Sequence, residues 1–155
     1  MPLVKKVLED GLRGMMNPET SPSSLQEAAS RWSSLYHSYA QSAIAGVVLP
    51  TTLNLALIKI PLSGPGMFLQ NLSAGIEAYW MGTLWVSPGF TGVTANASGL
   101  ATTLIPIGTS LATSINATVE QSATRYASAI DAYTKTVRVI VTNVTSGVTS
   151  PAFLS

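Results

Sequence analysis

Apolar residues recur at helical spacing in three separate segments of the chain. In the first segment Trp32, Tyr36 and Tyr39 fall three or four positions apart, which places them on one face of a helix. Ser24 and Thr118 each precede a Glu or Gln by three residues, the spacing of a capping box at a helix start. The pattern predicts helices near 24–43, 67–82 and 118–137.

The predicted helices are similar in sequence. Residues 24–39 align without gaps on residues 118–133, and a fainter third copy lies at 75–79. A unit of this kind cannot bury its apolar face alone, so we expect the copies to pack on one another. Each helix is followed by a β-prone stretch; these stretches span 45–50, 83–88 and 136–142.

These patterns favour a mainly α fold. We expect one helical domain over residues 1–143, built from about three weak helix-plus-short-strand repeats with a short β element. Residues 87–98 combine Pro88 with glycines and carry no charge, which predicts a loop. Residues 144–155 are expected to form an extended C-terminal tail.

The composition is unusual in its lack of charge. The 155 residues include 8 Lys and Arg and 7 Asp and Glu, so charged residues make up 10%, against about 25% in ordinary soluble domains. A net charge of +1 argues against reading nucleic-acid sequence, which needs clustered Lys and Arg. The chain has no cysteine, which excludes disulfides and thiolate chemistry.

Candidate catalytic and metal-binding patterns are missing from the sequence. The single histidine, His37, falls in the middle of a predicted helix and is interpreted as a solvent-facing residue, because its repeat counterparts Glu77 and Asp131 are acidic. No nucleophile elbow, P-loop or dinucleotide fingerprint occurs, and the acidic residues are too scattered for a metal site. We therefore predict a protein that is not an enzyme and has no cofactor, metal or catalytic residues.

Two apolar windows, at 43–58 and 99–115, raise the question of a membrane protein. Neither reaches the roughly 18 to 20 continuous apolar residues of a spanning helix, and both are interrupted by proline and polar residues. Buried protein segments are the better interpretation, so a membrane partner is not expected. The N-terminal residues are charged where a signal peptide is apolar, which favours synthesis in the cytoplasm.

The low charge predicts that neighbouring proteins cover much of the surface. A folded monomer of this mass exposes about 7,500 Å², which leaves roughly one charge per 500 Å², whereas apolar patches beyond a few hundred Å² mark contact sites. We expect a symmetric homo-oligomer or a larger assembly. The residues predicted as interface anchors are Trp85, Phe90, Phe153 and Leu154.

The chain also resembles a known class of proteins. The capped, alanine-rich segment 24–39, the helix-to-strand passage at 127–137 and the cysteine-free Ser, Thr, Gly and Ala filler are similar to small structural virion proteins of tailed bacteriophages. The resemblance implies a non-enzymatic subunit located in the virion, most simply a ring-forming head-to-tail connector or neck component that docks on portal, adaptor or tail proteins. Capsid cement and tail or baseplate proteins are alternatives, and a holin-like membrane-active protein is a second alternative.

Overall fold

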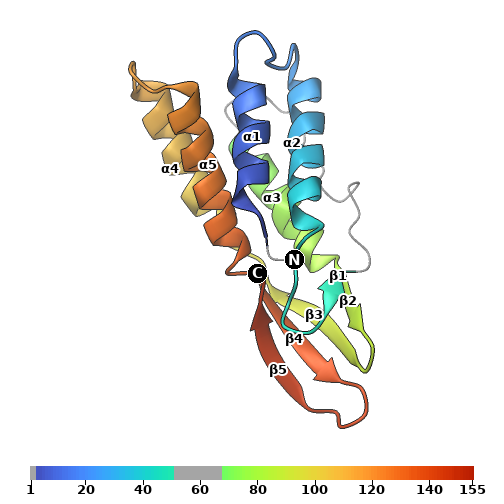
Figure 1. The fold of residues 1–155 in the computed structure, drawn as a ribbon. Coiled ribbons are helices and arrows are strands. Elements are labelled where there is room, and N and C mark those ends of the chain that lie inside the picture. The colour runs from blue at the N-terminus through green and yellow to red at the C-terminus, as the bar shows by residue number, and fades with distance from the viewer. Residues whose placement is uncertain (1–2, 51–67) are drawn as a thin grey trace.

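The protein has two layers, a helical bundle above a five-stranded antiparallel sheet (Figure 1). The computed structural model describes residues 3–50 and 68–155, so part of the predicted apolar window at 43–58 lies outside the described residues. In chain order the elements are α1 (Lys5–Met16), α2 (Leu25–Ala40), β1 (Leu49–Pro50), α3 (Phe68–Met81), β2 (Leu84–Ser87), β3 (Phe90–Asn96), α4 (Leu100–Thr113), α5 (Val119–Thr134), β4 (Arg138–Asn143) and β5 (Thr149–Phe153).

The prediction of a mainly α fold was wrong, because the chain is α+β. The strands follow one another across the sheet in the order β1-β2-β3-β4-β5, each antiparallel to the next. The predicted loop at 87–98 contains β3, and the predicted tail at 144–155 contains β5, which pairs with β4 from Arg138↔Phe153 to Thr142↔Thr149. Long-range backbone pairing, rather than strong local β propensity, holds these segments in strands.

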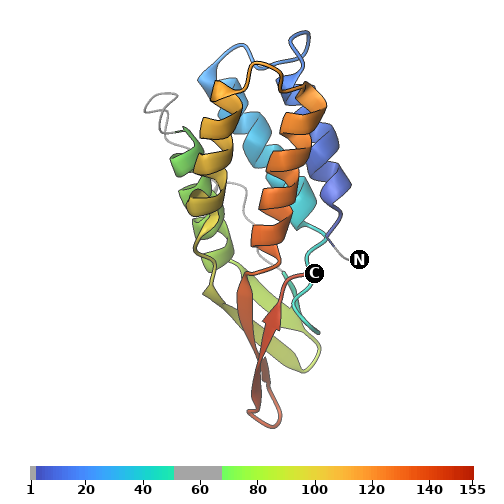
Figure 2. The ribbon, with the colours of Figure 1, turned by 90° about the vertical axis from the view of Figure 1, so that its left-hand side faces the viewer.

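The repeated helices are α2, α3 and α5. The predicted capping box is complete at Thr118 but only half formed at Ser24, because the Glu27 carboxylate accepts from the backbone N–H and hydroxyl of Ser23 instead of the backbone of Ser24. The Ser24 hydroxyl accepts a hydrogen bond from the backbone of Glu27, and Thr118 forms a complete capping box with Gln121. Each of the three helices leads into a strand, since β1, β2 and β4 are the next elements along the chain. Figure 2 shows the helices side by side, with the β4–β5 hairpin extending farthest from them.

Aromatic side chains form the centre of the bundle. Tyr36 and Tyr79 are essentially inaccessible to solvent, and so is Trp80. The Trp80 indole stacks on Trp85 of β2, with ring centroids 5.8 Å apart and an interplanar angle of 11°. This stack connects the bundle to the inner face of the sheet.

The equivalent tyrosines of the three repeats each form a hydrogen bond with a residue of another element or connection. Tyr39 of α2 donates to Asp131 of α5 at 2.7 Å, and the Tyr79 hydroxyl of α3 lies 3.1 Å from Nδ1 of His37 of α2. Tyr133 of α5 donates to the carbonyl of Ala97, just before α4. The three repeats therefore meet at their C-terminal ends, next to the sheet, through polar groups as well as apolar faces.

The sheet is partly closed by the segment after α2. Ile44 and Ser155 exchange two backbone hydrogen bonds of 3.2 and 3.0 Å, and Ala45 forms a bridge with Leu154. The chain then turns at Gly46 (φ +59°) and continues into β1, which pairs with β2. One segment therefore connects the β5 side of the sheet to the β2 side.

Two glycines of α1 lead to a stability prediction. Gly14 has open space around it, so Gly14→Ala is expected to raise the free energy of unfolding by about 0.5–1 kcal/mol through helix propensity. At Gly11 an added Cβ would lie 2.3 Å from Cδ1 of Leu35, so Gly11→Ala is expected to be less stable than Gly14→Ala by about 1 kcal/mol or more. Urea unfolding of both variants measures the difference. Equal effects would show that α1 and α2 do not pack closely at Gly11.

Candidate functional site

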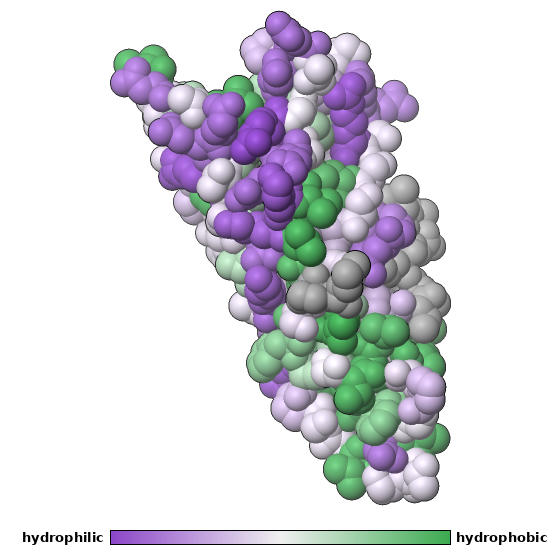
Figure 3. Space-filling view, in the orientation of Figure 1, coloured by the Kyte–Doolittle hydropathy of each residue, from purple (hydrophilic) through white to green (hydrophobic). Residues whose placement is uncertain are grey.

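Charge is separated along the molecule. Among the described residues, the charged side chains lie on the helices and their connections, and Arg138 is the sole charged residue within a strand. Most of the helical charges are paired, for example Lys5 with Glu9 at 3.2 Å and Lys6 with Asp10 at 3.1 Å. Figure 3 shows hydrophilic residues gathered over the helices and hydrophobic ones over the sheet end of the face in view.

The outer face of the sheet, which points away from the core, exposes apolar side chains. Successive strand residues alternate between faces, and in β2 Trp85 is buried while its neighbours Leu84 and Val86 are 57% and 45% exposed. The strand register extends this face across the sheet, since Leu84 pairs with Val93, which pairs with Ile140. We define the outer face by Leu49, Leu84, Val86, Thr91, Val93, Arg138, Ile140, Thr142, Thr149, Pro151 and Phe153.

The inner face of the sheet, by contrast, is filled. Val139 and Val141 of β4 are buried, and Gly92 of β3 leaves room for its neighbours: an added Cβ there would lie 2.8 Å from Cβ of Trp85. Val48, from the segment that partly closes the sheet, packs at the same point. The apolar residues of the outer face are therefore not a second half of the core but a separate surface.

The four predicted interface anchors fall in different places. Trp85 and Leu154 are 1% and 3% exposed and belong to the core, so this fold does not present them to a partner. Phe90 is half-buried and lines a hollow of about 400 Å³ between Val47 and the β4–β5 turn. Phe153 is 56% exposed and lies on the outer face, where its role as an anchor stays a prediction. Prediction from sequence missed Leu84, Val86 and Val93. The alternation around Trp85 was the signal for Leu84 and Val86, whereas β3 gave no such signal for Val93.

The hydrogen-bonded tyrosines form a polar cluster, and a catalytic function of this protein would depend on these side chains. Asp131 accepts a hydrogen bond from Tyr39 and another from Lys135, each at 2.7 Å. Asp131 is 8% exposed and His37 is half-buried, so the prediction that these repeat positions face solvent was wrong. The polar groups instead hold the helices together at their C-terminal ends.

The protonation of the cluster follows from its burial. Burial raises the pKa of Tyr39 and of Tyr79 far above the usual value of about 10, and the hydrogen bond to Asp131 raises that of Tyr39 further. A general acid or base works best with a pKa near the working pH, which these phenols do not have. The cluster is suited to positioning helices, and the absence of catalysis stays a prediction.

Glu77 has a local structural task. Its carboxylate accepts hydrogen bonds from the backbone N–H groups of Gly99, at 2.9 Å, and Leu100, at 3.1 Å. These are the first N–H groups of α4, whose N-cap Gly99 has a φ of +107° and no side chain to satisfy them. Glu77 thus caps α4 from α3, which explains a partly buried charge in the least charged part of the chain.

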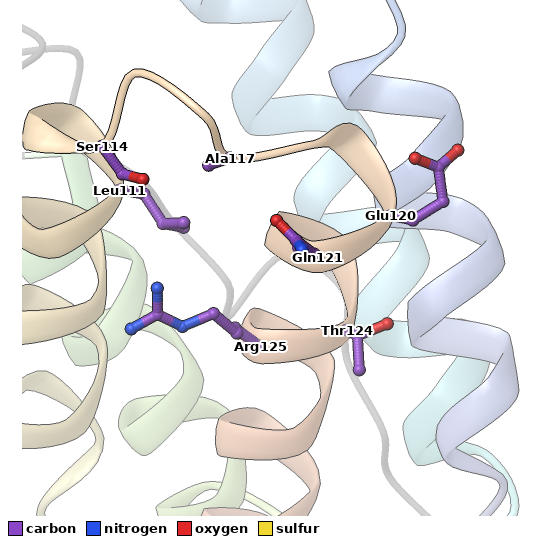
Figure 4. A pocket seen from close by; sticks show the side chains of 7 residues that line it. All are labelled: Leu111, Ser114, Ala117, Glu120, Gln121, Thr124 and Arg125. Carbon is purple, nitrogen blue, oxygen red and sulfur yellow. The ribbon is translucent and has the colours of Figure 1, made fainter.

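A hollow between α4 and α5 lies close to charged residues. It measures about 420 Å³ and opens near the turn that joins the two helices. Figure 4 shows Arg125 and Leu111 reaching towards one another across it, whereas Glu120 points away. Arg125 donates a hydrogen bond to the hydroxyl of Ser110 at 3.2 Å, so its guanidinium already has a partner in α4. The hollow has no converging set of polar groups with which to orient a small molecule.

Two other kinds of site and the comparison with known proteins remain to be considered. In the described part of the chain no three His, Asp or Glu side chains come together as a metal site would need. No helix among residues 3–50 and 68–155 is both long and apolar enough to cross a bilayer. Comparison with known proteins finds no family model, no curated protein and no solved structure that matches this chain.

Proposed function

We propose that this chain is a non-enzymatic structural subunit that assembles with other proteins through its sheet end. The observation that carries the proposal is the exposed, nearly uncharged outer face, on which Val93 and Phe153 are 66% and 56% exposed. Apolar patches of this kind mark contact sites, because water wets them at a cost in free energy. The paired charges of the helices keep the opposite end of the molecule hydrated.

Within this class, we propose a tailed-phage virion protein that forms a ring at the head-to-tail connection and docks on portal or tail proteins. This narrower assignment is supported by the sequence resemblance of segments 24–39 and 127–137 to small virion proteins. Capsid cement and tail or baseplate subunits share the same requirement for a covered surface. Assembly without detergent would distinguish all of these from a holin-like protein, which would need to enter a membrane.

The proposal predicts discrete oligomers of the full chain without detergent. Light scattering and negative-stain electron microscopy of the purified protein are expected to find assemblies of defined mass and ring shape. A stable monomer at millimolar concentration would contradict an assembly subunit.

Two further observations test whether the protein is located in the virion. Mass spectrometry of purified phage particles that encode this chain is expected to detect it in many copies, and its gene is expected to lie among portal, capsid and tail genes. Recovery of the chain in the membrane fraction of expressing cells, with none in particles, would favour the holin-like alternative.

A further inference from the structure

We infer that Pro151 closes the free edge of β5, so that this edge cannot accept a strand from another molecule. β5 is the last strand in the order β1-β2-β3-β4-β5. An edge strand presents unpaired backbone N–H and C=O groups that readily pair with a second chain. Protection of this edge does not depend on the proposed function, because an open edge is a hazard to any folded protein.

The hydrogen bonds of β5 show which of its backbone groups face outwards. Asn143 donates to the carbonyl of Val148 at 2.9 Å, where β4 and β5 meet at their turn. Antiparallel pairs that exchange hydrogen bonds alternate with pairs that do not. Every second residue of β5 from Val148 onwards, including Ser150, therefore bonds to β4. The backbone groups of Thr149 and Pro151 point the other way, towards the free edge.

The end of the chain agrees with this alternation. Ser155 lies an even number of residues beyond Pro151, and it exchanges two backbone hydrogen bonds of 3.2 and 3.0 Å with Ile44 on the side away from β4. The segment after α2 thus covers the C-terminal end of the edge. Thr149 and Pro151 are exposed, and Figure 2 shows the β4–β5 hairpin extending beyond the helices. This part of the edge is left for the sequence of β5 itself to protect.

Proline removes the donor that an added strand would need. It has no backbone N–H, and its ring occupies the space into which that N–H would point. A strand laid against Thr149 and Pro151 would lose a hydrogen bond of the ladder and bring its own carbonyl group against the ring. The nitrogen of Pro151 faces away from β4, so the hydrogen bonds between β4 and β5 stay intact.

The low charge of the chain explains why proline is needed here. Charged side chains, lysine above all, are a common protection of edge strands, and Thr149–Phe153 contains none. Uncharged segments that can adopt a strand are also those that most readily join intermolecular sheets. Pro151 therefore does in β5 what charge does in other sheets, and contacts with other proteins at this edge are left to side chains.

The test restores the missing donor. Pro151→Thr is expected to let copies of the chain pair along β5, which hydrogen exchange measured amide by amide would detect. Between about 10 μM and about 1 mM protein, exchange at Thr149 and at position 151 of this variant is expected to slow about tenfold or more. In the parent protein the Thr149 amide is expected to exchange rapidly at both concentrations.

Ser150→Thr is the matched control, because it introduces the same side chain one residue earlier, where the N–H already bonds to β4. It is expected to behave like the parent. Slow exchange at Ala152 in each chain, whose amide also points to β4, shows that the hairpin is formed.

Three results would overturn the inference. They are the lack of concentration-dependent slowing in a folded Pro151→Thr, equal slowing at Thr149 in Ser150→Thr, and slowing at Thr149 in the parent. If Pro151→Thr does not fold, the parent decides: rapid exchange at Thr149 at about 1 mM supports a closed edge, and slow exchange contradicts it.

Discussion

Replacing Trp80 with alanine is expected to lower the free energy of unfolding by about 4 kcal/mol, near the upper range for large-to-small changes in a core. The side chain is fully buried, and its ring contacts Tyr36, Tyr79 and Trp85. Its Nε1–H donates a hydrogen bond to the Tyr36 hydroxyl at 2.6 Å. The loss would weaken the packing of the bundle on the sheet as well as leave a cavity, because Trp80 stacks on Trp85 of β2.

Two controls separate these contributions. Trp80→Phe keeps a ring in the core but removes the donor to Tyr36, so about 1–2 kcal/mol of destabilisation is expected. Met81→Ala changes the next residue of α3, which is 55% exposed, and is expected to stay within about 0.5 kcal/mol of the parent. Chemical unfolding followed by tryptophan fluorescence and circular dichroism measures all three. If Trp80→Ala costs no more than Met81→Ala, Trp80 does not occupy the core described above.

The second large effect is expected at high pH, where the protein should unfold cooperatively. Burial is the main cause that raises the pKa of Tyr36, Tyr39, Tyr79 and Tyr133 above the usual value. The unfolded chain releases these protons above about pH 10, while the folded chain keeps them. Stability is therefore fully present below pH 10 and falls as the pH rises further.

The number of buried tyrosines sets how steeply the free energy of unfolding falls with pH. Each contributes about 1.4 kcal/mol per pH unit, so four contribute about 5 kcal/mol per pH unit. A domain of ordinary stability, about 5–15 kcal/mol, would therefore unfold between about pH 11 and pH 13. Tyrosinate absorbance and circular dichroism should change together, and Tyr79→Phe should reduce the slope by about a quarter. Gradual tyrosine titration near pH 10 with the secondary structure intact would contradict the buried cluster.

The helices could be predicted from sequence because their signals are local. Apolar spacing placed Tyr36 and Tyr39 on one buried face, and the side chains of Ser24 and Thr118 act within one turn of their own helices. The strands were harder, because a strand is stabilised by partners elsewhere in the chain. In β3 the buried positions are Gly92 and Thr94, which gave no apolar alternation to recognise.

Prediction of the candidate surface from sequence fails for the same reason, and the error is a single strand position. The sequence pointed to Trp85 and Leu154 as interface anchors, yet both point into the core, and their neighbours Val86 and Phe153 face outwards. Because side chains alternate along a strand, a shift of one residue exchanges the two faces. Hydrophobicity alone cannot choose between them, since a Trp is as suitable for a core as for an interface.

Composition and short-range spacing, available in the sequence by itself, determined that this protein has three related helices and too few charges to cover its surface. The tertiary structure alone decided where that shortage of charge falls, because the order of the strands and the phase of their alternation gather the exposed side chains of Leu84, Val93 and Phe153 on one face of the sheet. The physical reason is that helix signals act within a few residues, whereas a sheet face is assembled from strands as far apart as β1 and β5.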